Sequence, residues 1–211
     1  DFCLSRGLGD VYKRQLTVRA QQPDRIRRIG VLMALRETDP EAKGFLSEFT
    51  QGLAALGWTD GRNMRIEVRW AVSNLESMRK FAKELVDFQP DAILANSTAV
   101  TAALQHETQT IPIVFAIVGD PVGSGFVASL SRPGRNITGL GVFEESMPSK
   151  WLDLLREIAP GVKRATFMFN PETAPYINSF LVPPFEAAAA ALKIAPSVAR
   201  VYNNGDIETV I

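Results

Sequence analysis

Apolar runs of strand length alternate with amphipathic segments of helix length through most of this sequence. Strands are expected at 29–35, 64–70, 92–95, 111–118 and 137–142. Helices are expected at 40–56, 75–86, 99–107 and 121–130. Strands that alternate with helices of this length form βαβ units, so the pattern predicts an α/β fold with a parallel sheet.

Two of the expected strands differ in a way that places them in the sheet. The run 29–35 is continuously apolar, which suits a strand covered on both faces. In 64–70, apolar residues alternate with Arg65, Glu67 and Arg69, so one face is polar and the strand belongs near an edge. We therefore expect the strand order 2-1-3-4-5 of flavodoxin-like sheets.

The alternation starts again after residue 143. A helix is expected at 147–158, a strand at 164–169, a long helix through the alanines 187–191, a strand at 198–202, and a last helix capped by Asp206. The expected domains are thus a first lobe, 27–143, and a second lobe, 144–211. Two strands do not bury a core by themselves, so we interpret the second lobe as incomplete and the chain as truncated at both ends. We predict that this 211-residue fragment is unstable or aggregates.

The N-terminal residues call for a separate interpretation. Residues 1–15 show no helical or strand period and resemble translated sequencing-adapter sequence, with a disordered natural terminus as the alternative. Residues 16–26 carry Val18-Arg19-Ala20, which resembles the end of a secretory signal peptide, or else form a polar lead-in to the first strand. The single cysteine, Cys3, lies in the excluded segment, which argues against a disulfide framework, a thiolate metal site or a cysteine nucleophile.

Composition and charge argue against some classes of partner. Hydrophobic residues make up 46% and charged residues 22% of the chain, as in ordinary globular proteins. The 23 Lys and Arg balance the 23 Asp and Glu, so no overall positive field is available to hold nucleic acid. No apolar run approaches the roughly 20 residues that cross a bilayer, which argues against an integral membrane protein.

The sequence contains few residues of the kinds that catalyse reactions. His106 is the only histidine and lies in a polar helical context, so an exposed position is expected. Without a second histidine or a credible cysteine, few residues are available to build a zinc site or a Ser-His triad, and no nucleophile elbow, Walker loop or zinc-protease motif is present. We interpret the glycines of 120–125 as a tight turn and Glu144-Glu145 as a solvated connector. We predict no enzyme, no metal and no cofactor.

Capping residues recur where expected parallel strands end. Asp39-Pro40, Asp120-Pro121 and Asn170-Pro171 each follow a strand, and Asn96-Ser97-Thr98 occupies the same topological place. Open α/β sheets bind ligands at this edge, where free helix amides favour carboxylates and other anions. The alternative is that each junction only caps its own helix, and both interpretations stay open here.

A longer string carries a resemblance to a known family. The residues from Asp120-Pro121-Val122-Gly123-Ser124-Gly125 to Ser131-Arg132-Pro133-Gly134-Arg135-Asn136-Ile137-Thr138-Gly139 resemble the signature of ABC-transporter substrate-binding proteins of the type I periplasmic-binding fold. The segments 28–32, 52–58 and 111–115 match the same family, which includes tryptophan-binding and other amino-acid-binding members. The resemblance covers essentially 21–211. It implies two flavodoxin-like or Rossmann-like lobes joined by three crossings, with ligand between them and the first crossing near 143–146.

The resemblance also implies site residues. Thr98 matches the threonine that opens the third helix of the family, Asp120 the aspartate after the following strand, and Asn170 the second-lobe Asn-Pro; position 99, commonly proline, is Ala99 here. Ser97 and Thr98 would bind ligand through hydroxyls and helix amides, and Asp120 would accept from an ammonium or cap its helix. Tyr176 would stack on an apolar ligand or lie in the core, and the core interpretation is favoured for Trp151.

The implied function is a solute receptor of an ABC importer. Such a receptor would bind an amino acid or related carboxylate, close around it and dock on the membrane permease as a soluble, periplasmic monomer. Because no cysteine stands at the expected mature start, Gln21, a lipid anchor is not expected. A ligand-sensing regulatory domain of the same fold and a Rossmann-like enzyme are the alternatives.

Overall fold

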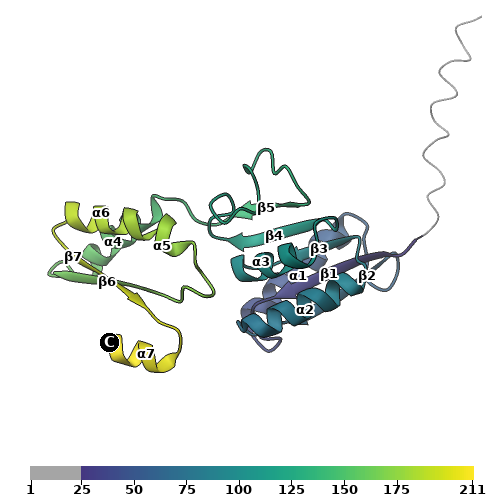
Figure 1. Cartoon of the computed structure of the whole chain (residues 1–211), viewed down its shortest axis with the longest axis horizontal. Coiled ribbons are helices and arrows are strands. Elements are labelled where there is room, and N and C mark those ends of the chain that lie inside the picture. Colours follow the sequence, from purple (N-terminus) through teal and green to yellow (C-terminus); the bar gives the residue numbers. More distant parts are fainter. Residues whose placement is uncertain (1–24) are drawn as a thin grey trace, which may run out of the picture.

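The computed structural model describes residues 25–211 and arranges them as two α/β lobes (Figure 1). The proposed adapter segment 1–15, with Cys3, lies outside the described residues, as do residues 16–24 of the proposed signal remnant. Among the helices of residues 25–211, none is long and apolar enough to cross a membrane.

The first lobe is built on a five-stranded parallel sheet. Its strands are β1 (Arg27–Met33), β2 (Met64–Trp70), β3 (Ala92–Ala95), β4 (Ile113–Val118) and β5 (Ile137–Gly141). They follow the order β2-β1-β3-β4-β5, and all four pairings are parallel. The expected order is therefore confirmed, with the polar-faced β2 at an edge.

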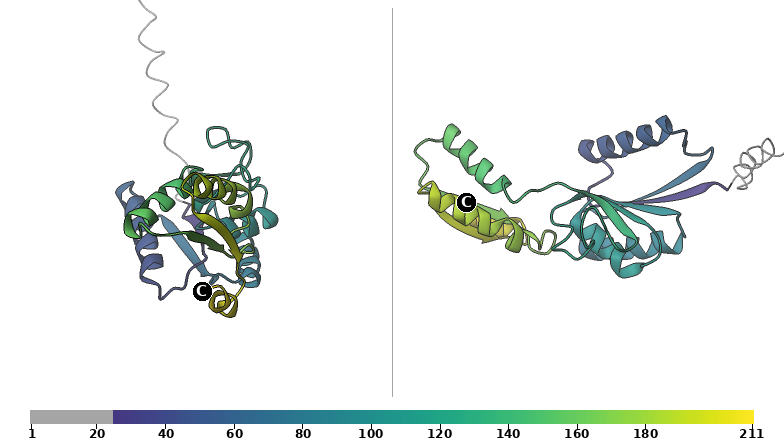
Figure 2. Two further views of the ribbon diagram at one scale, coloured as in Figure 1. Left: turned by 90° about the vertical axis from the view of Figure 1, so that its left-hand side faces the viewer. Right: turned by 90° about the horizontal axis from the view of Figure 1, so that it is seen from above.

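Helices cover the two faces of this sheet unequally. The helices are α1 (Pro40–Ala55), α2 (Leu75–Asp87) and α3 (Thr98–Glu107). Seen from above, α2 and α3 lie on one face and α1 on the other (Figure 2). Because α1 packs mainly over β1 and β2, Val114 and Leu140 on its side of β4 and β5 remain exposed. The main core of the lobe lies between the sheet and the α2–α3 layer.

Local signals account for where these helices begin and end. The Asp39 side chain accepts from the Glu41 amide at the start of α1, and Gly57 adopts a positive φ of 87° after its end. In α2, Met78, Ala82 and Leu85 recur at helical spacing and are buried against the sheet.

The expected helix at 121–130 is wrong. Pro121 begins only a turn, in which the amides of Phe126 and Val127 both donate to its carbonyl at 3.0 and 3.3 Å. Gly125 takes a left-handed φ of 72°, which reverses the chain and ends the turn. Two glycines within three residues also make a continued helix unfavourable.

The second lobe contains a two-stranded parallel sheet, β6-β7. Its elements are α4 (Met147–Ile158), β6 (Arg164–Phe169), α5 (Ile177–Phe180), α6 (Val182–Ala191), β7 (Ala195–Arg200) and α7 (Asn204–Val210). Buried Leu152, Phe185, Ala189 and Ile194 form its small core.

Three expectations for this lobe are corrected. The long helix is divided at Leu181 into α5 and α6, because Pro183 and Pro184 have no amide hydrogen to continue the helix from α5. The last strand spans β7 and not 198–202, because its pairing with β6 begins at Ala195. Asn203 is the N-cap of α7, and Asp206 completes a capping box from the third helical position.

Candidate ligand-binding site

Side chains after β3 tie together the carboxyl ends of neighbouring strands. The Asn96 side-chain oxygen accepts from the Ala34 amide after β1 at 2.7 Å, and the Thr98 hydroxyl accepts from the Gly119 amide after β4 at 3.3 Å. Asn96 and Thr98 are both buried. These two predicted site residues therefore hold three strand ends in fixed positions.

Ser97 caps the helix that starts at this edge. Its hydroxyl accepts from the Val100 amide at 3.2 Å, and its carbonyl accepts from the Thr101 hydroxyl at 2.7 Å. The N-terminus of α3, with its positive dipole end, thus opens at the carboxyl edge of the sheet.

A bulge displaces the end of β4. The register with β5 shifts by one residue between Phe115 and Val118, and Ile117 adopts a left-handed φ of 57°. This conformation is costly for a β-branched residue, and bulges of this kind re-aim the residues that follow. Gly119 and Asp120 come directly after the bulge.

Asp120 and Asn170 each shape a turn in their own lobe. Asp120 Oδ1 accepts from the Gly123 amide at 2.7 Å. Asn170 Oδ1 accepts from the Glu172 amide at 2.8 Å, and its side-chain nitrogen donates to the Tyr202 carbonyl at 3.5 Å, which joins the ends of β6 and β7.

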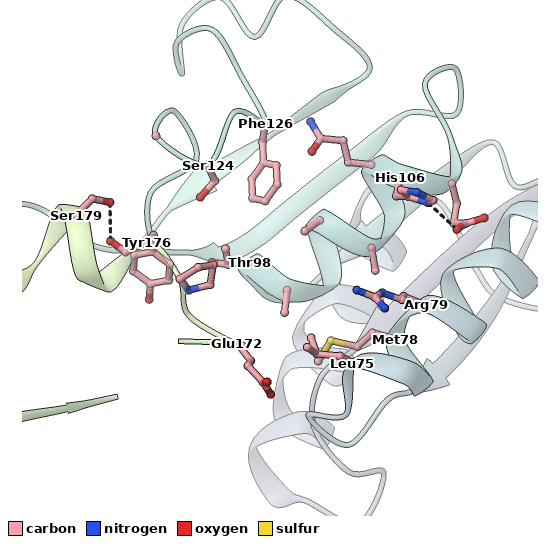
Figure 3. Close-up of a pocket in the computed structure, with 17 residues that line it drawn as sticks. Leu75, Met78, Arg79, Thr98, His106, Ser124, Phe126, Glu172, Tyr176 and Ser179 are labelled. Atoms are coloured by element: carbon pink, nitrogen blue, oxygen red, sulfur yellow. Dashed lines mark hydrogen bonds and ion pairs between the residues drawn. The ribbon is translucent and has the colours of Figure 1, made fainter. Parts of the chain in front are cut away.

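A cavity of about 700 Å³ is lined from both lobes. Figure 3 shows Thr98 and Tyr176 close together on one side, with Leu75, Met78 and Arg79 on another. Of the predicted site residues, Thr98 and Tyr176 line this cavity, whereas Asn96, Ser97, Asp120 and Asn170 do not.

The lining combines an apolar surface with a few polar groups. The apolar part comes from α2, α3 and the turn after β4, namely Leu75, Met78, Ala99, Ala102, Ala103 and Phe126. Hydroxyls of Thr98 and Ser124 come from the first lobe, and the Glu172 carboxylate comes from the second. Such a lining suits a small molecule with an apolar body and polar or charged ends.

Tyr176 reaches the first lobe from the segment before α5. Its ring stacks on Phe143 with centroids 6.2 Å apart and planes inclined by 27°. It also lies against Gly119, where a Cβ would overlap the ring. Partial burial raises the pKa of the Tyr176 phenol above its ordinary value.

His106 is exposed, as the sequence predicts, whereas Trp151 is only half-buried and lies outside the core expected for it. Trp151 packs against Phe167 and Phe143, with centroids 5.9 and 6.3 Å away, and does not line the cavity. The His106 side chain is 86% exposed at the far end of α3, although it borders the cavity. In residues 25–211, no three His, Cys, Asp or Glu side chains come together as a metal site requires.

Sequence reasoning missed Gly119, Phe143 and Glu172. Glu172 follows Asn170-Pro171 directly, so the junction pattern could have included it. Gly119 and Phe143 both lie against the Tyr176 ring, and Tyr176 is distant from them in the sequence. No local sequence pattern marks either residue.

Comparisons with known proteins agree on one family. A family model described as ABC transporter substrate binding protein matches residues 30–211. A tyrosine-binding protein of Clostridioides difficile (strain R20291) is 31% identical over 132 residues, which is 63% of this chain and 36% of that protein.

Solved structures show the same fold. A conserved domain protein from Vibrio cholerae is 28% identical with a TM-score of 0.78, over 88% of this chain and 60% of that one. An ABC domain from Streptococcus pneumonia in complex with L-Trp is 22% identical with a TM-score of 0.77, over 87% of this chain and 60% of that one. The chain therefore spans less than two thirds of the length of these relatives.

The parallel sheet of five strands, the second α/β lobe and the family match over most of the sequence lead to the same assignment. The chain belongs to the ABC transporter substrate-binding protein family.

Proposed function

We propose that the protein is the extracytoplasmic solute receptor of an ABC importer and binds an amino acid between its two lobes. The observation that carries this proposal is the cavity lined by Thr98 of the first lobe and by Glu172 and Tyr176 of the second. A ligand that contacts both lobes stabilises the closed arrangement over the open one, whereas a ligand held by one lobe does not. The family match favours a receptor over a regulatory domain or an enzyme.

The lining gives each part of an amino acid a partner. The Glu172 carboxylate would pair with the ammonium, and the Thr98 hydroxyl and the N-terminus of α3 with the carboxylate. An apolar or aromatic side chain would lie along Met78, Ala102 and Phe126. Relatives named for tyrosine binding or solved with L-Trp support this class of ligand.

The remaining predicted residues act on this site through the backbone. Asn96 and Ser97 fix the ends of β1 and β3 and the start of α3. Asp120 holds the turn that precedes Ser124, and Asn170 holds the turn that contains Glu172. In this proposal the closed receptor, a monomer in the periplasm, then docks on the membrane permease.

Calorimetric titration of the full-length protein with the twenty amino acids tests the proposal. We expect aromatic amino acids to bind most tightly. Glu172→Gln should weaken binding about tenfold, the effect of losing one charge-assisted hydrogen bond. Glu186→Gln, an exposed substitution in α6, is the matched control and should bind as wild type. Absence of binding to every amino acid would overturn the ligand class.

Osmotic-shock fractionation tests the location. The full-length gene expressed in a Gram-negative host should give protein in the periplasmic fraction. Recovery only with the cytoplasm would contradict the proposed export.

A further inference from the structure

The backbone conformation of Gly119 does not by itself require a glycine. Its φ lies outside the left-handed region, so other residues could adopt the same conformation. The obstacle is Tyr176: a Cβ on Gly119 would overlap Cε2, Cζ and the hydroxyl oxygen of that ring. Because Gly119 has no side chain, the Tyr176 ring of the second lobe can lie against the first lobe.

The position of Gly119 is fixed from the first-lobe side. Its amide donates to the buried Thr98 hydroxyl at 3.3 Å. The bulge at Ile117 sets which residue reaches the carboxyl end of β4, and such a costly conformation persists only where the surrounding structure enforces it. Gly119 is thus held in place by the first lobe, and the Tyr176 ring lies against it.

Tyr176 is both a contact between the lobes and a wall of the cavity. Its ring stacks on Phe143, which lies between β5 and α4, where the chain passes from one lobe to the other. The same residue lines the cavity beside Thr98 (Figure 3). Where the ring lies against the first lobe therefore affects both the contact between the lobes and the shape of the ligand site.

We infer that Gly119 is a positioning residue for ligand binding: by having no side chain, it lets Tyr176 lie against the end of β4 and so sets the approach of the two lobes. This inference rests on the proposed function, because it assumes that the cavity holds the ligand. Even a methyl group at position 119 has to displace the ring, and we expect the second lobe that carries the ring to shift with it.

The experiment compares Gly119→Ala with wild type in the full-length protein. Calorimetry with the tightest-binding amino acid measures affinity, and spin labels on cysteines introduced at exposed Lys43 and Glu186, with every other cysteine changed to Ser, measure the distance between the lobes. We expect Gly119→Ala to bind at least tenfold more weakly and to show a longer distance without ligand. Gly52→Ala, where a Cβ meets no atom within 4 Å, is the control and should match wild type in both.

A double variant separates this role from general damage to the fold. If Gly119 acts through Tyr176, Gly119→Ala added to Tyr176→Ala should cost no further affinity. Tyr176→Phe keeps the ring and should keep the wild-type distance. An unchanged distance in Gly119→Ala, or a full tenfold loss of affinity in the Tyr176→Ala background, would overturn the inference. Should no amino acid bind the wild type, the proposed function fails, while the distances without ligand still decide the role of Gly119.

Discussion

The two lobes are alike in their local structure and unlike in what they bury. In the first, β3 and β4 lie between other strands, and residues such as Leu85, Ile93 and Phe115 are almost fully buried. In the second, the core reduces to a small cluster, and an apolar hollow of about 380 Å³ lies open beside Trp151 and Phe167. Caps and periodicity build the elements of both lobes, but burial requires further strands and helices beside them.

The largest expected effect comes from truncating one buried phenylalanine in each lobe. Phe115→Ala should lower the free energy of unfolding of the first lobe by about 4 kcal/mol, because it leaves a cavity in a closely packed core. Phe185→Ala should cost about 2 kcal/mol, below the usual range, because the cluster around it is small and lies beside the open hollow. Urea unfolding of the full-length protein, followed by circular dichroism, measures both. Equal losses would show that the second lobe is as well packed as the first.

The next comparison is between one glycine of each lobe and the effect of replacing it by alanine. In the first lobe, Gly139 has a φ of 158°, and a Cβ there would overlap the Phe115 carbonyl and ring, so Gly139→Ala should cost about 2 kcal/mol. In the second lobe, a Cβ on Gly161 meets no atom within 4 Å, so Gly161→Ala should change stability by less than about 0.5 kcal/mol. Thermal unfolding of both variants measures the difference. A loss at Gly161 as large as that at Gly139 would contradict the packing difference between the lobes.

A smaller effect concerns acid stability. Asp91 accepts hydrogen bonds from the Arg28 amide at 2.8 Å and from the Arg27 side chain at 3.0 Å, and these lower the pKa of its carboxyl. A lowered pKa in the folded state stabilises the protein above the ordinary carboxyl pKa of about 4, and this stability is lost as the pH falls through the folded value.

Asp91→Asn should therefore cost about 1 kcal/mol at pH 7 and progressively less as the pH falls below about 4. Unfolding at a series of pH values measures this. Asp153→Asn, an exposed change in α4 of the second lobe, is the matched control and should change the free energy of unfolding by less than about 0.5 kcal/mol. A cost for Asp91→Asn that stays constant with pH would contradict the assigned cause.

The sequence predicted those features whose signals are local. Asp39-Pro40 marks the start of α1, and the alternation of Arg65, Glu67 and Arg69 places β2 at the edge. After Asp120 the sequence led to two expectations, a tight turn at the glycines of 120–125, which is confirmed, and a helix at 121–130, which is wrong. The left-handed φ of Gly125 ends the helical turn there, so no helix continues.

The site was predicted less well because its geometry depends on distant partners. The Asn96 side-chain oxygen accepts a hydrogen bond from the amide of Ala34, which lies 62 residues away in the sequence. The Thr98 hydroxyl accepts one from the amide of Gly119, which lies 21 residues away. Residue type at a strand end therefore identifies the edge of the sheet. It does not tell which side chains face a ligand and which bind the backbone.

The smallest expected effect lies where the two lobes meet. Burial raises the pKa of the Tyr176 phenol, so its contribution to stability is present below the ordinary value of about 10 and is lost as the pH rises through the folded value. Phe143→Ala removes the stacked ring and admits water, and should lower the phenol pKa toward its ordinary value. Titration of ¹³C-labelled tyrosine by NMR, with Tyr176→Phe to assign the signal, measures it. Val114→Ala, on the exposed face of β4, should leave the titration unchanged. An unchanged pKa in Phe143→Ala would mean that the second lobe, and not the crossing between the lobes, buries this ring.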